Sequence, residues 1–160
     1  MTVLDTHVRL IALLNQYEVQ YKLLTHECEG RSKEISKIRG NDPSQAMKAI
    51  VLRVRGGGNN RRNILAVIPG NRRLNMKALL ANVGAQKGRF ATLNEVNHLT
   101  GCVSGAIPPF TFKKNLILIV DEYFKQWNEV AFNAGRLDRS IMMDFEDYVS
   151  VANPAFTSFS

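Results

Sequence analysis

The residues from Ala46 to Arg55 constrain the fold more than any other stretch, because they have the pattern of a buried β-strand. At a period of two, one face carries Lys48, Ile50, Leu52 and Val54, and the other carries Met47, Ala49, Val51, Arg53 and Arg55. Lys48 therefore lies on the more apolar face, at the start of the strand. Two interpretations are open. The ammonium group reaches the rim of the sheet, or it is held in a cleft that binds an anionic or ester-bearing ligand.

Length and composition indicate one ordinary globular domain. The chain has 160 residues, enough to bury a core, and its apolar and charged fractions are 45% and 22%. No apolar run approaches the roughly 20 residues that span a bilayer, and the first residues lack the pattern of an export signal. Two cysteines, Cys28 and Cys102, are too few for a disulfide framework. We therefore expect a single domain over residues 1–160, in the cytoplasm and without a membrane partner.

The positive charge is concentrated in the first part of the chain. The formal net charge is +7, but residues 1–90 hold 16 Lys/Arg against 6 Asp/Glu, whereas residues 91–160 hold 5 against 8. A basic half beside a mildly acidic half favours a surface that faces a polyanion. Many small basic proteins bind no polyanion, so the charge alone makes nucleic acid a candidate partner and does not establish it.

Hydrophobic periodicity and turn residues predict an α+β chain of short elements. Strands are expected at residues 19–26, 46–55, 63–68, 116–120, 129–133 and 140–143, with 116–120 buried on both faces. Helices are expected at residues 3–15, after Ser32 as a cap, at 74–81, at 93–99 after a Thr92–Glu95 capping box, and from Asp144. Residues 56–60 are predicted as a hairpin loop and the tail after Pro154 as loose. The expected architecture is a curled sheet with helices packed outside.

A glycine- and proline-rich loop is the second unusual feature. Residues 101–109 read Gly-Cys-Val-Ser-Gly-Ala-Ile-Pro-Pro. Glycines leave backbone N–H groups uncovered, and such groups can hydrogen-bond a ligand carbonyl or an oxyanion. An ordinary turn remains an equally valid interpretation of this pattern.

Three segments together carry a resemblance to a known family. The strand Met47-Lys48-Ala49-Ile50-Val51-Leu52, the loop from Thr100 to Pro109, and the turn Phe132-Asn133-Ala134-Gly135 occur in an order and spacing that resemble the YbaK family, particularly its YeaK-type subgroup. These proteins are free-standing relatives of the editing domain inserted in bacterial prolyl-tRNA synthetases. The resemblance implies a mixed, six- to seven-stranded barrel-like sheet. It also implies trans-editing, the hydrolysis of the ester that joins a wrong amino acid to the terminal adenosine of a tRNA, without a metal or organic cofactor.

The resemblance also implies roles for particular residues. Lys48 matches the functional lysine of the family, and Gly105 with Pro109 matches its Gly-x-x-x-Pro loop. Contacts to the aminoacyl group are expected from His26, Gly101, Ala106, Ile107, Pro109 and Asn133. Ser140 stands where some relatives carry an acidic pocket residue, so a contact there is in doubt. The family's pockets take small amino acids, of which Ser, Thr or Ala are favoured here.

The chemistry of ester hydrolysis suits these residues. An aminoacyl ester is already activated, so its hydrolysis depends on positioning the ester and a water. Lys48 as an ammonium group would hold the terminal phosphate or polarise the ester, and N–H groups near Gly105 would stabilise charge on the carbonyl oxygen. The ribose hydroxyl of the substrate is a candidate for assisting the water.

We expect the protein to bind the tRNA acceptor stem through its phosphates rather than its bases. The expected contacts are Arg31, Arg53, Arg55, Arg61 and Arg62. An aminoacyl-tRNA synthetase is a further candidate partner, and the oligomeric state is left open.

Several alternatives stay open. His26 is a general base or a hydrogen-bonded structural histidine, and Asn133 is an amino-acid contact or a turn residue. A cysteine hydrolase would use Cys28 or Cys102 with His26 or His98, although nothing in the sequence places a base next to either thiol. The same four residues are possible zinc ligands, but their spacings miss the usual Cys-x-x-Cys pattern. A non-catalytic RNA-binding module explains the basic half equally well. Substitution of Lys48 separates it from an enzyme, because only an enzyme would lose turnover.

Overall fold

The computed structural model describes residues 5–56 and 60–160, in which it places five α-helices and eight strands. The helices are α1 (Thr6–Gln16), α2 (Ser32–Arg39), α3 (Met76–Val83), α4 (Leu93–Thr100) and α5 (Phe145–Ala152). The strands are β1 (Tyr21–Thr25), β2 (Met47–Arg55), β3 (Arg61–Pro69), β4 (Lys87–Phe90), β5 (Leu116–Asp121), β6 (Glu129–Arg136), β7 (Arg139–Asp144) and β8 (Ala155–Thr157). Single 3₁₀ turns occupy Pro43–Gln45 and Glu122–Gln126.

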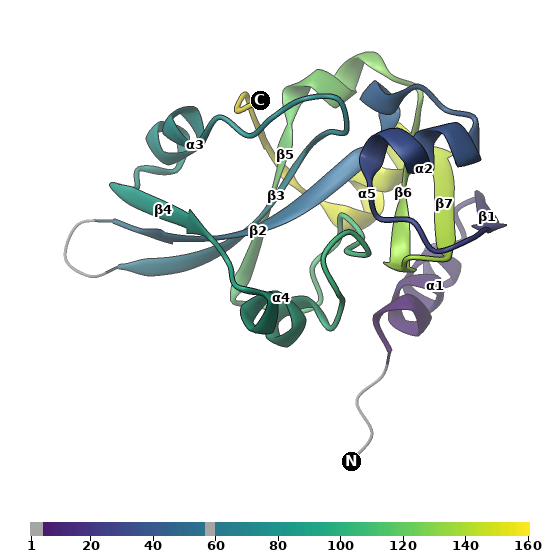
Figure 1. Ribbon diagram of the computed structural model, residues 1–160, viewed down its shortest axis with the longest axis horizontal. Coiled ribbons are helices and arrows are strands. Elements are labelled where there is room, and N and C mark those ends of the chain that lie inside the picture. The colour runs from purple at the N-terminus through teal and green to yellow at the C-terminus, as the bar shows by residue number, and fades with distance from the viewer. Residues whose placement is uncertain (1–4, 57–59) are drawn as a thin grey trace.

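The strands form two sheets rather than one. A five-stranded sheet has the order β4-β2-β3-β5-β8, and a three-stranded antiparallel sheet has the order β1-β7-β6. In the larger sheet β3, β5 and β8 run parallel, and β2 pairs antiparallel with both β3 and β4. A single bridge between Ala46 and Ala131 joins the sheets where β2 begins, and Figure 1 shows β2 running from the hairpin end toward β6 and β7.

The α+β class is therefore confirmed, but the barrel-like sheet is not. Eight strands are divided between two sheets, and no ladder in the described part of the chain closes either one. Each sheet ends in short strands: β4 and β8 border the larger sheet, and β1 borders the smaller one. The predicted count of six or seven strands missed two of these edge strands, β4 and β8.

The two faces of β2 pack into separate hydrophobic clusters. Leu52 and Val54 pack with Ile64 and Ile68 of β3 and with Leu79 of α3. Met47 and Val51, on the opposite face, join the larger cluster that lies between the sheets. Burying both faces of one strand explains its near-continuous apolar sequence. Lys48 lies on the α3 face of β2, at the end where that cluster stops.

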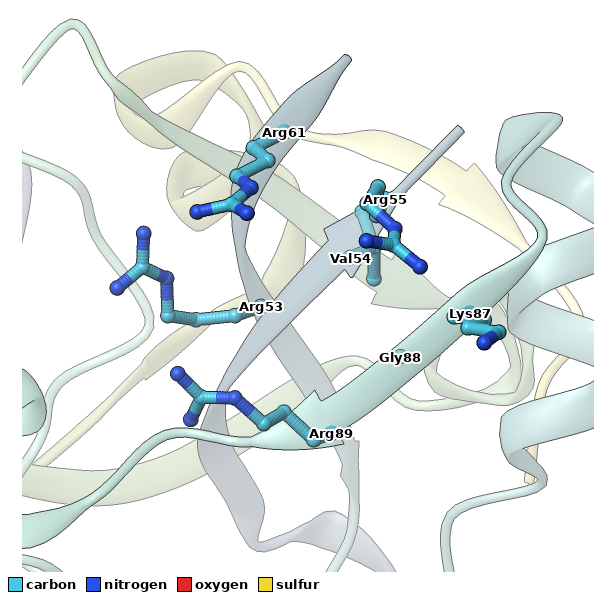
Figure 2. Close-up of a pocket in the computed structure, with 7 residues that line it drawn as sticks. All are labelled: Arg53, Val54, Arg55, Arg61, Lys87, Gly88 and Arg89. Atoms are coloured by element: carbon cyan, nitrogen blue, oxygen red, sulfur yellow. The ribbon is translucent and has the colours of Figure 1, made fainter. Parts of the chain in front are cut away.

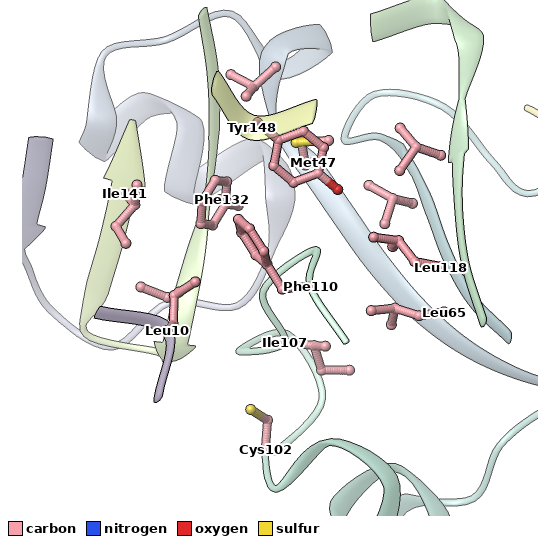
Figure 3. Packing of buried hydrophobic residues seen from close by; sticks show 14 of the residues in the cluster. Leu10, Met47, Leu65, Cys102, Ile107, Phe110, Leu118, Phe132, Ile141 and Tyr148 are labelled. Carbon is pink, nitrogen blue, oxygen red and sulfur yellow. The ribbon is translucent and has the colours of Figure 1, made fainter. Parts of the chain in front are cut away.

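Aromatic side chains fill the larger cluster and fix the glycine- and proline-rich loop. The Phe110 ring packs edge-on against Phe132 and Tyr148, with ring centroids 5.6 and 5.1 Å apart. Figure 3 shows these three rings together beside Met47. The buried Tyr148 hydroxyl donates to the carbonyl of Pro109 at 2.6 Å. Since that carbonyl is enclosed by the core, this hydrogen bond holds the end of the loop against α5.

Capping residues confirm most helix ends and correct one. The Thr92–Glu95 capping box begins α4 as predicted, and Gly40, Gly84 and Gly101 end α2, α3 and α4 with positive φ. The N-cap of α2 is Arg31 and not Ser32, and it makes no side-chain capping bond. Helix α1 begins at Thr6 after an Asp5 cap, so the predicted start near residue 3 falls among residues 1–4, outside the described part.

Three other predictions need correction or lie beyond the described residues. The tail is not loose, because Ala155–Thr157 forms β8 and Phe159 is only 1% exposed. Strand β5 is not buried on both faces throughout, because Ile117 is 40% exposed. Residues 57–59 of the predicted hairpin loop are not described. Among the helices that are described, none has the length and apolar character needed to cross a membrane.

Candidate functional site

A small cavity lies where the first residues of β2 meet α2, β6 and the Gly105 loop. Its volume is about 40 Å³. Four of the predicted site residues line it: Lys48, Gly105, Ile107 and Asn133. The remaining lining residues come mainly from the α2 segment and β2 and were not predicted: Gly30, Ser32, Ile35, Arg39, Ala46, Met47 and Ala49. We call this space the Lys48 cavity.

Lys48 is half-buried at the edge of this cavity. Its Nζ donates to the carbonyl of Arg72 at 3.0 Å, in the turn that follows β3. The guanidinium of Arg72 stacks over the ring of Tyr123, with Cζ 3.8 Å from the ring centroid, which anchors that turn. Burial lowers the pKa of Lys48, and the nearby charge of Arg73 lowers it further. Lys48 has no ion pair with a described carboxylate. A cation held this way can attract an oxygen of a ligand.

Gly105 occupies a position that only glycine fits. Its φ is +89°, and a Cβ there would lie 3.0 Å from the Cα of Gly30. The close approach of Gly30 and Gly105 forms one wall of the cavity. Among the described residues, the N–H groups of Gly105 and Ile107 have no acceptor, whereas the N–H of Ala106 donates to Val103 O at 3.1 Å. Two residues that line the cavity therefore carry a backbone donor without an acceptor in the described part of the chain.

Asn133 fixes the loop to the segment that precedes α2. Its Nδ2 donates to the carbonyls of Gly105 at 2.7 Å and Glu29 at 3.0 Å, and its Oδ1 accepts from the Ser140 hydroxyl at 3.0 Å. Both Asn133 and Ser140 are buried. Asn133 therefore lines the cavity and also holds two of its walls together.

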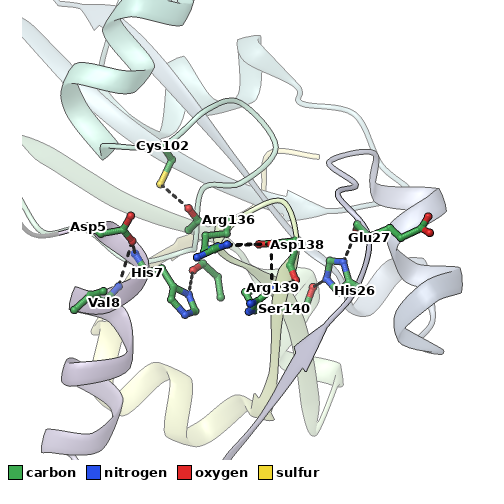
Figure 4. A network of polar contacts seen from close by, with 12 residues as sticks. Asp5, His7, Val8, His26, Glu27, Cys102, Arg136, Asp138, Arg139 and Ser140 are labelled. Carbon is green, nitrogen blue, oxygen red and sulfur yellow. Dashed lines mark hydrogen bonds and ion pairs between the residues drawn. The ribbon is translucent and has the colours of Figure 1, made fainter.

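His26 lies behind Ser140 and does not line the cavity. Its Nε2 is 2.7 Å from Ser140 Oγ, and its Nδ1 is 2.7 Å from the carbonyl oxygen of Glu27. Figure 4 shows the imidazole between these two partners. With both ring nitrogens engaged, the geometry favours the structural interpretation of His26 over a general base.

Gly101, Ala106 and Pro109 support the loop from outside the cavity. Gly101 ends α4, where a Cβ would lie 2.6 Å from Thr6 Oγ1. The carbonyl of the buried Ala106 accepts from Gly135 N at 2.9 Å, which ties the loop to the end of β6. Pro109 is held by Tyr148. These three residues shape the loop. Of residues 101–109, only Gly105 and Ile107 line the cavity.

A second, larger hollow lies on the outer part of the five-stranded sheet. It measures about 400 Å³ and is lined by Arg53 and Arg55 of β2, Arg61 of β3, and Lys87, Gly88 and Arg89 of β4, with Val54 beneath. We call it the basic groove. Figure 2 shows its five cationic side chains on the three neighbouring strands. Arg55 lies opposite both Arg61 and Lys87 in the strand register, and Arg53 lies opposite Arg89.

One carboxylate partly neutralises the basic groove. Glu95 forms ion pairs with Arg53 and Arg89, and these hydrogen bonds hold the pKa of Glu95 well below its usual range. Arg55, Arg61 and Lys87 have no ion pair with a described carboxylate. Like charges directly opposite on paired strands destabilise a sheet, so this arrangement favours a bound anion.

Two predicted tRNA contacts do not lie in the basic groove. Arg31 forms an ion pair with Glu29 at 2.7 Å, in the segment that leads into α2. Arg62 belongs to the opposite face of β3, where its Nη2 donates to the carbonyl of Val83 at 2.7 Å at the end of α3. The structure thus groups three of the five predicted arginines and separates two.

Comparison with known proteins identifies the family. The model of the aminoacyl-tRNA editing domain matches residues 26–151. The chain belongs to this family.

Individual relatives of this editing domain agree with the match. The chain is 40% identical to a protein of Escherichia coli strain K12 named multifunctional Ser/Thr-tRNA deacylase ProXp-y, over 96% of this chain and 92% of that protein. It is 24% identical to EbsC of Enterococcus faecalis, named as a candidate Cys-tRNA(Pro)/Cys-tRNA(Cys) deacylase, over 92% and 90% of the two chains. A solved structure described as a candidate trans-editing enzyme for prolyl-tRNA synthetase superposes with a TM-score of 0.81 at 21% identity, covering 99% of each chain. At that identity the superposition shows the fold.

Two chemical alternatives gain no support in this editing domain. Cys102 is buried and hydrogen-bonds to the carbonyl of Thr100, and burial raises the pKa of its thiol. Cys28 is exposed and does not line the Lys48 cavity. Within residues 5–56 and 60–160, no group of three or more His, Cys, Asp or Glu side chains is placed to hold a metal ion.

Arg39 is the lining residue that sequence reasoning missed most clearly. It is the last residue of α2, followed by the Gly40 cap, where a basic side chain normally interacts with the end of the helix. Nothing in the sequence distinguishes it from an exposed arginine. In the editing domain it is only 9% exposed. Only the packing of α2 against β7 reveals that it is buried.

Proposed function

We propose that this editing domain is a trans-editing deacylase, which hydrolyses the ester between a small amino acid (Ser, Thr or Ala) and the terminal adenosine of a mischarged tRNA. The observation that carries the proposal is the Lys48 cavity, which places a cation and two free backbone donors around a very small space. The name of the E. coli relative, a Ser/Thr-tRNA deacylase, supports the same substrate class. We propose that residues 1–160 act as one domain in the cytoplasm.

The size of the cavity sets the size of the amino acid. A cavity needs about 10–15 Å³ to hold one water, so about 40 Å³ accommodates about three or four atoms of water size. The side chains of alanine, serine and threonine have one to three non-hydrogen atoms. The side chains of Ile35, Met47 and Ile107 line this space and leave little room for a larger side chain. The cavity therefore favours small side chains by exclusion.

The lining residues favour positioning over nucleophilic catalysis. None of the described residues that line the Lys48 cavity is a carboxylate, a cysteine or a histidine, and the one lining hydroxyl, that of Ser32, therefore has no such residue in the lining to activate it. In the proposed reaction, Lys48 attracts the ester or the terminal phosphate, and the N–H groups of Gly105 and Ile107 stabilise charge on the carbonyl oxygen. The neighbouring ribose hydroxyl orients the attacking water. The products are the free amino acid and the deacylated tRNA.

The basic groove is the proposed docking site for the acceptor stem. Arg53, Arg55 and Arg61, joined by Lys87 and Arg89, would contact phosphates. Arg31 lies at the other end of the domain, in the segment that lines the Lys48 cavity, and would meet the terminal nucleotides there. Arg62 lies on the other face of β3, where it donates to the carbonyl of Val83, so we do not include it among the proposed groove contacts. A synthetase remains a candidate partner for delivery of the tRNA.

A non-catalytic RNA-binding module is the second candidate, and the basic groove is the observation that favours it. Such a module needs the groove but not the Lys48 cavity. Substitution of Lys48 would then leave RNA affinity unchanged and there would be no turnover to lose.

The test is a panel of mischarged tRNAs under single-turnover conditions. Seryl-, threonyl-, alanyl- and cysteinyl-tRNA are compared with leucyl-tRNA as a large-side-chain control, each with wild-type protein and with Lys48→Ala. We expect hydrolysis of at least one small aminoacyl ester, no acceleration for leucyl-tRNA, and loss of the activity in the variant. Tight tRNA binding without acceleration of any ester would support the binding module instead.

A further inference from the structure

A second cation, the buried Arg39, lines the Lys48 cavity without an ion pair to a described carboxylate. Arg39 lines the cavity and is 9% exposed. Buried arginines are normally paired with a carboxylate, because an uncompensated charge is costly to desolvate. Arg39 has no ion pair with any Asp or Glu in the described residues.

The known contacts of Arg39 use only part of its hydrogen-bonding capacity. Its Nε donates to Asn41 Oδ1 at 3.1 Å, and one Nη1 hydrogen donates to Ser140 Oγ at a long 3.4 Å. A guanidinium group has five N–H donors, so three remain. None of its nitrogen atoms is both sealed from solvent and without a partner. Nη2, the nitrogen without a partner, is therefore accessible, and Arg39 is one of the residues that line the cavity.

The charge of Arg39 persists at neutral pH. Burial lowers the pKa of its guanidinium to about 10, which still leaves the group protonated. Its two fixed partners, Asn41 and Ser140, are neutral. Ser140 is itself committed to Asn133 and His26, so the guanidinium is held in place while remaining short of acceptors.

The rest of the lining offers a ligand oxygen few other donors. Ile35, Ala46, Met47, Ala49 and Ile107 are apolar, and Ser32, at the start of α2, adds one neutral hydroxyl. Both Nδ2 hydrogens of Asn133 already bond to backbone carbonyls. An aminoacyl ester presents a carbonyl, an amino group and a side chain. The carbonyl is assigned to Lys48 and the Gly105 loop, and an ammonium group would be repelled by a guanidinium.

We propose that Arg39 is a specificity-determining residue whose guanidinium donates a hydrogen bond to the side-chain hydroxyl of a seryl or threonyl ester. This inference rests on the proposed deacylase function and names the feature of the substrate that the cavity recognises. A pocket built only from apolar residues barely separates analogues that differ by a hydroxyl, whereas a buried donor left unpaired penalises the analogue that lacks one. Arg39 therefore makes the cavity prefer serine and threonine over alanine.

The experiment compares seryl and alanyl esters on the same tRNA body. The quantity measured is the ratio of kcat/KM for the two substrates, for wild type, Arg39→Met, Arg39→Lys and Ser140→Ala, with Lys22→Met on exposed β1 as the control. We expect Arg39→Met to lower the seryl/alanyl ratio by about tenfold or more, the scale of one hydrogen bond to a charged group. Ser140→Ala should lower it less, because it removes one support of Arg39, and the control should not change it.

Folding is monitored in every variant by thermal unfolding, because Arg39 is buried. If Arg39→Met does not fold, the proposal is tested by the seryl/alanyl ratio of kcat/KM in Arg39→Lys and in Ser140→Ala. A ratio equal to that of wild type in both variants overturns the proposal. An equal loss on both esters also overturns it, because that result assigns Arg39 to the phosphate or the ester that all substrates share. A wild-type protein that hydrolyses no ester refutes the proposed function, and this inference with it. Measurable hydrolysis with an unaltered ratio in Arg39→Met refutes the inference alone.

Discussion

The Lys48 cavity and the basic groove lie toward opposite ends of the same strand and differ in almost every physical respect. The cavity is about 40 Å³ and is closed by four segments distant in sequence, whereas the groove is about 400 Å³ and is formed by three adjacent strands. Ala49 and Arg55 mark the two sites on one face of β2. They are six residue steps apart along the strand, or roughly 20 Å at about 3.3 Å per residue.

From this difference we expect the Lys48 cavity and the basic groove to serve different steps. A small cavity is suited to recognising one chemical group, and an open groove of five cations, three of them without a described carboxylate partner, is suited to holding a repeating polyanion with little regard to sequence. Substitutions at the two sites should therefore be separable. Those in the cavity should change the rate of bond breaking, and those in the groove should change the affinity for tRNA.

The largest effect is expected for Lys48→Ala. Removing the cation beside the ester should lower the single-turnover rate by about 100-fold, the scale of losing one preorganised electrostatic group. Lys48 is half-buried and unpaired with a carboxylate, so the melting temperature should change little. Lys22→Ala serves as the control for loss of a positive charge. A rate equal to that of wild type would show that Lys48 has no part in catalysis and that its ammonium group only reaches the rim of the sheet.

The next largest effect should come from Gly105→Ala. A Cβ at this position would meet the Cα of Gly30 at 3.0 Å, and a φ of +89° costs a non-glycine residue about 1–2 kcal/mol. We expect at least a tenfold loss of deacylation together with reduced stability. The matched variant is Gly56→Ala, where the nearest atom, Gly84 O, would lie 3.6 Å away. If both variants lose the same small amount of activity, the Gly105 loop is not the site of the carbonyl oxygen.

A smaller and different effect is expected when the basic groove is neutralised. Arg55→Gln with Arg61→Gln should raise KM for tRNA by about tenfold and leave the single-turnover rate at saturation unchanged. For each phosphate that the groove no longer neutralises, the dependence of log affinity on log salt should become shallower by about 0.9. The control is Lys22→Gln with Lys125→Gln, which removes two charges elsewhere on the surface. An unaltered salt slope would show that this pair does not dock the stem.

The smallest change in activity is expected for Tyr148→Phe, which tests the support of the loop. It leaves the Pro109 carbonyl buried without its donor, at a cost of about 1–3 kcal/mol. For a chain of this size, each kcal/mol lowers the melting temperature by roughly 2–4 °C. Deacylation should fall less than tenfold at a temperature where the variant is folded. A fall as large as that of Lys48→Ala would mean that the loop depends on this bond more than the structure indicates.

Sequence periodicity predicted the strands and loops of the two sites but not all their residues. The alternation in β2 placed Lys48 and the arginine pair on opposite faces, and the structure agrees. Lys87 and Arg89 were missed because β4 reads Lys-Gly-Arg-Phe, a short edge strand without apolar alternation. Its identity as a strand depends on pairing with β2, which is a tertiary contact.

The missed parts of the cavity have the same cause. Arg39 and Ile35 face the cavity because α2 packs beside β2 and β7, and no local pattern encodes that packing. Arg62 was predicted as a tRNA contact because it lies in the basic half of the chain, but adjacent residues in a strand point to opposite faces, and Arg62 points away from the basic groove. The single barrel-like sheet was implied by the family resemblance, and the hydrogen-bond ladders instead divide the strands between two sheets.

The central claim is that the Lys48 cavity serves ester hydrolysis and the basic groove serves tRNA binding. It is tested most directly by changing the length of the substrate. Hydrolysis of seryl-tRNA and of a minimal seryl-adenosine ester is measured for wild type, Lys48→Ala and the Arg55→Gln/Arg61→Gln variant. We predict that Lys48→Ala slows both substrates by a similar factor, about 100-fold. The groove variant should raise KM only for seryl-tRNA, because the minimal ester has no stem for it to bind. A groove variant that impairs both substrates equally, or a Lys48 variant that impairs only seryl-tRNA, would contradict the account.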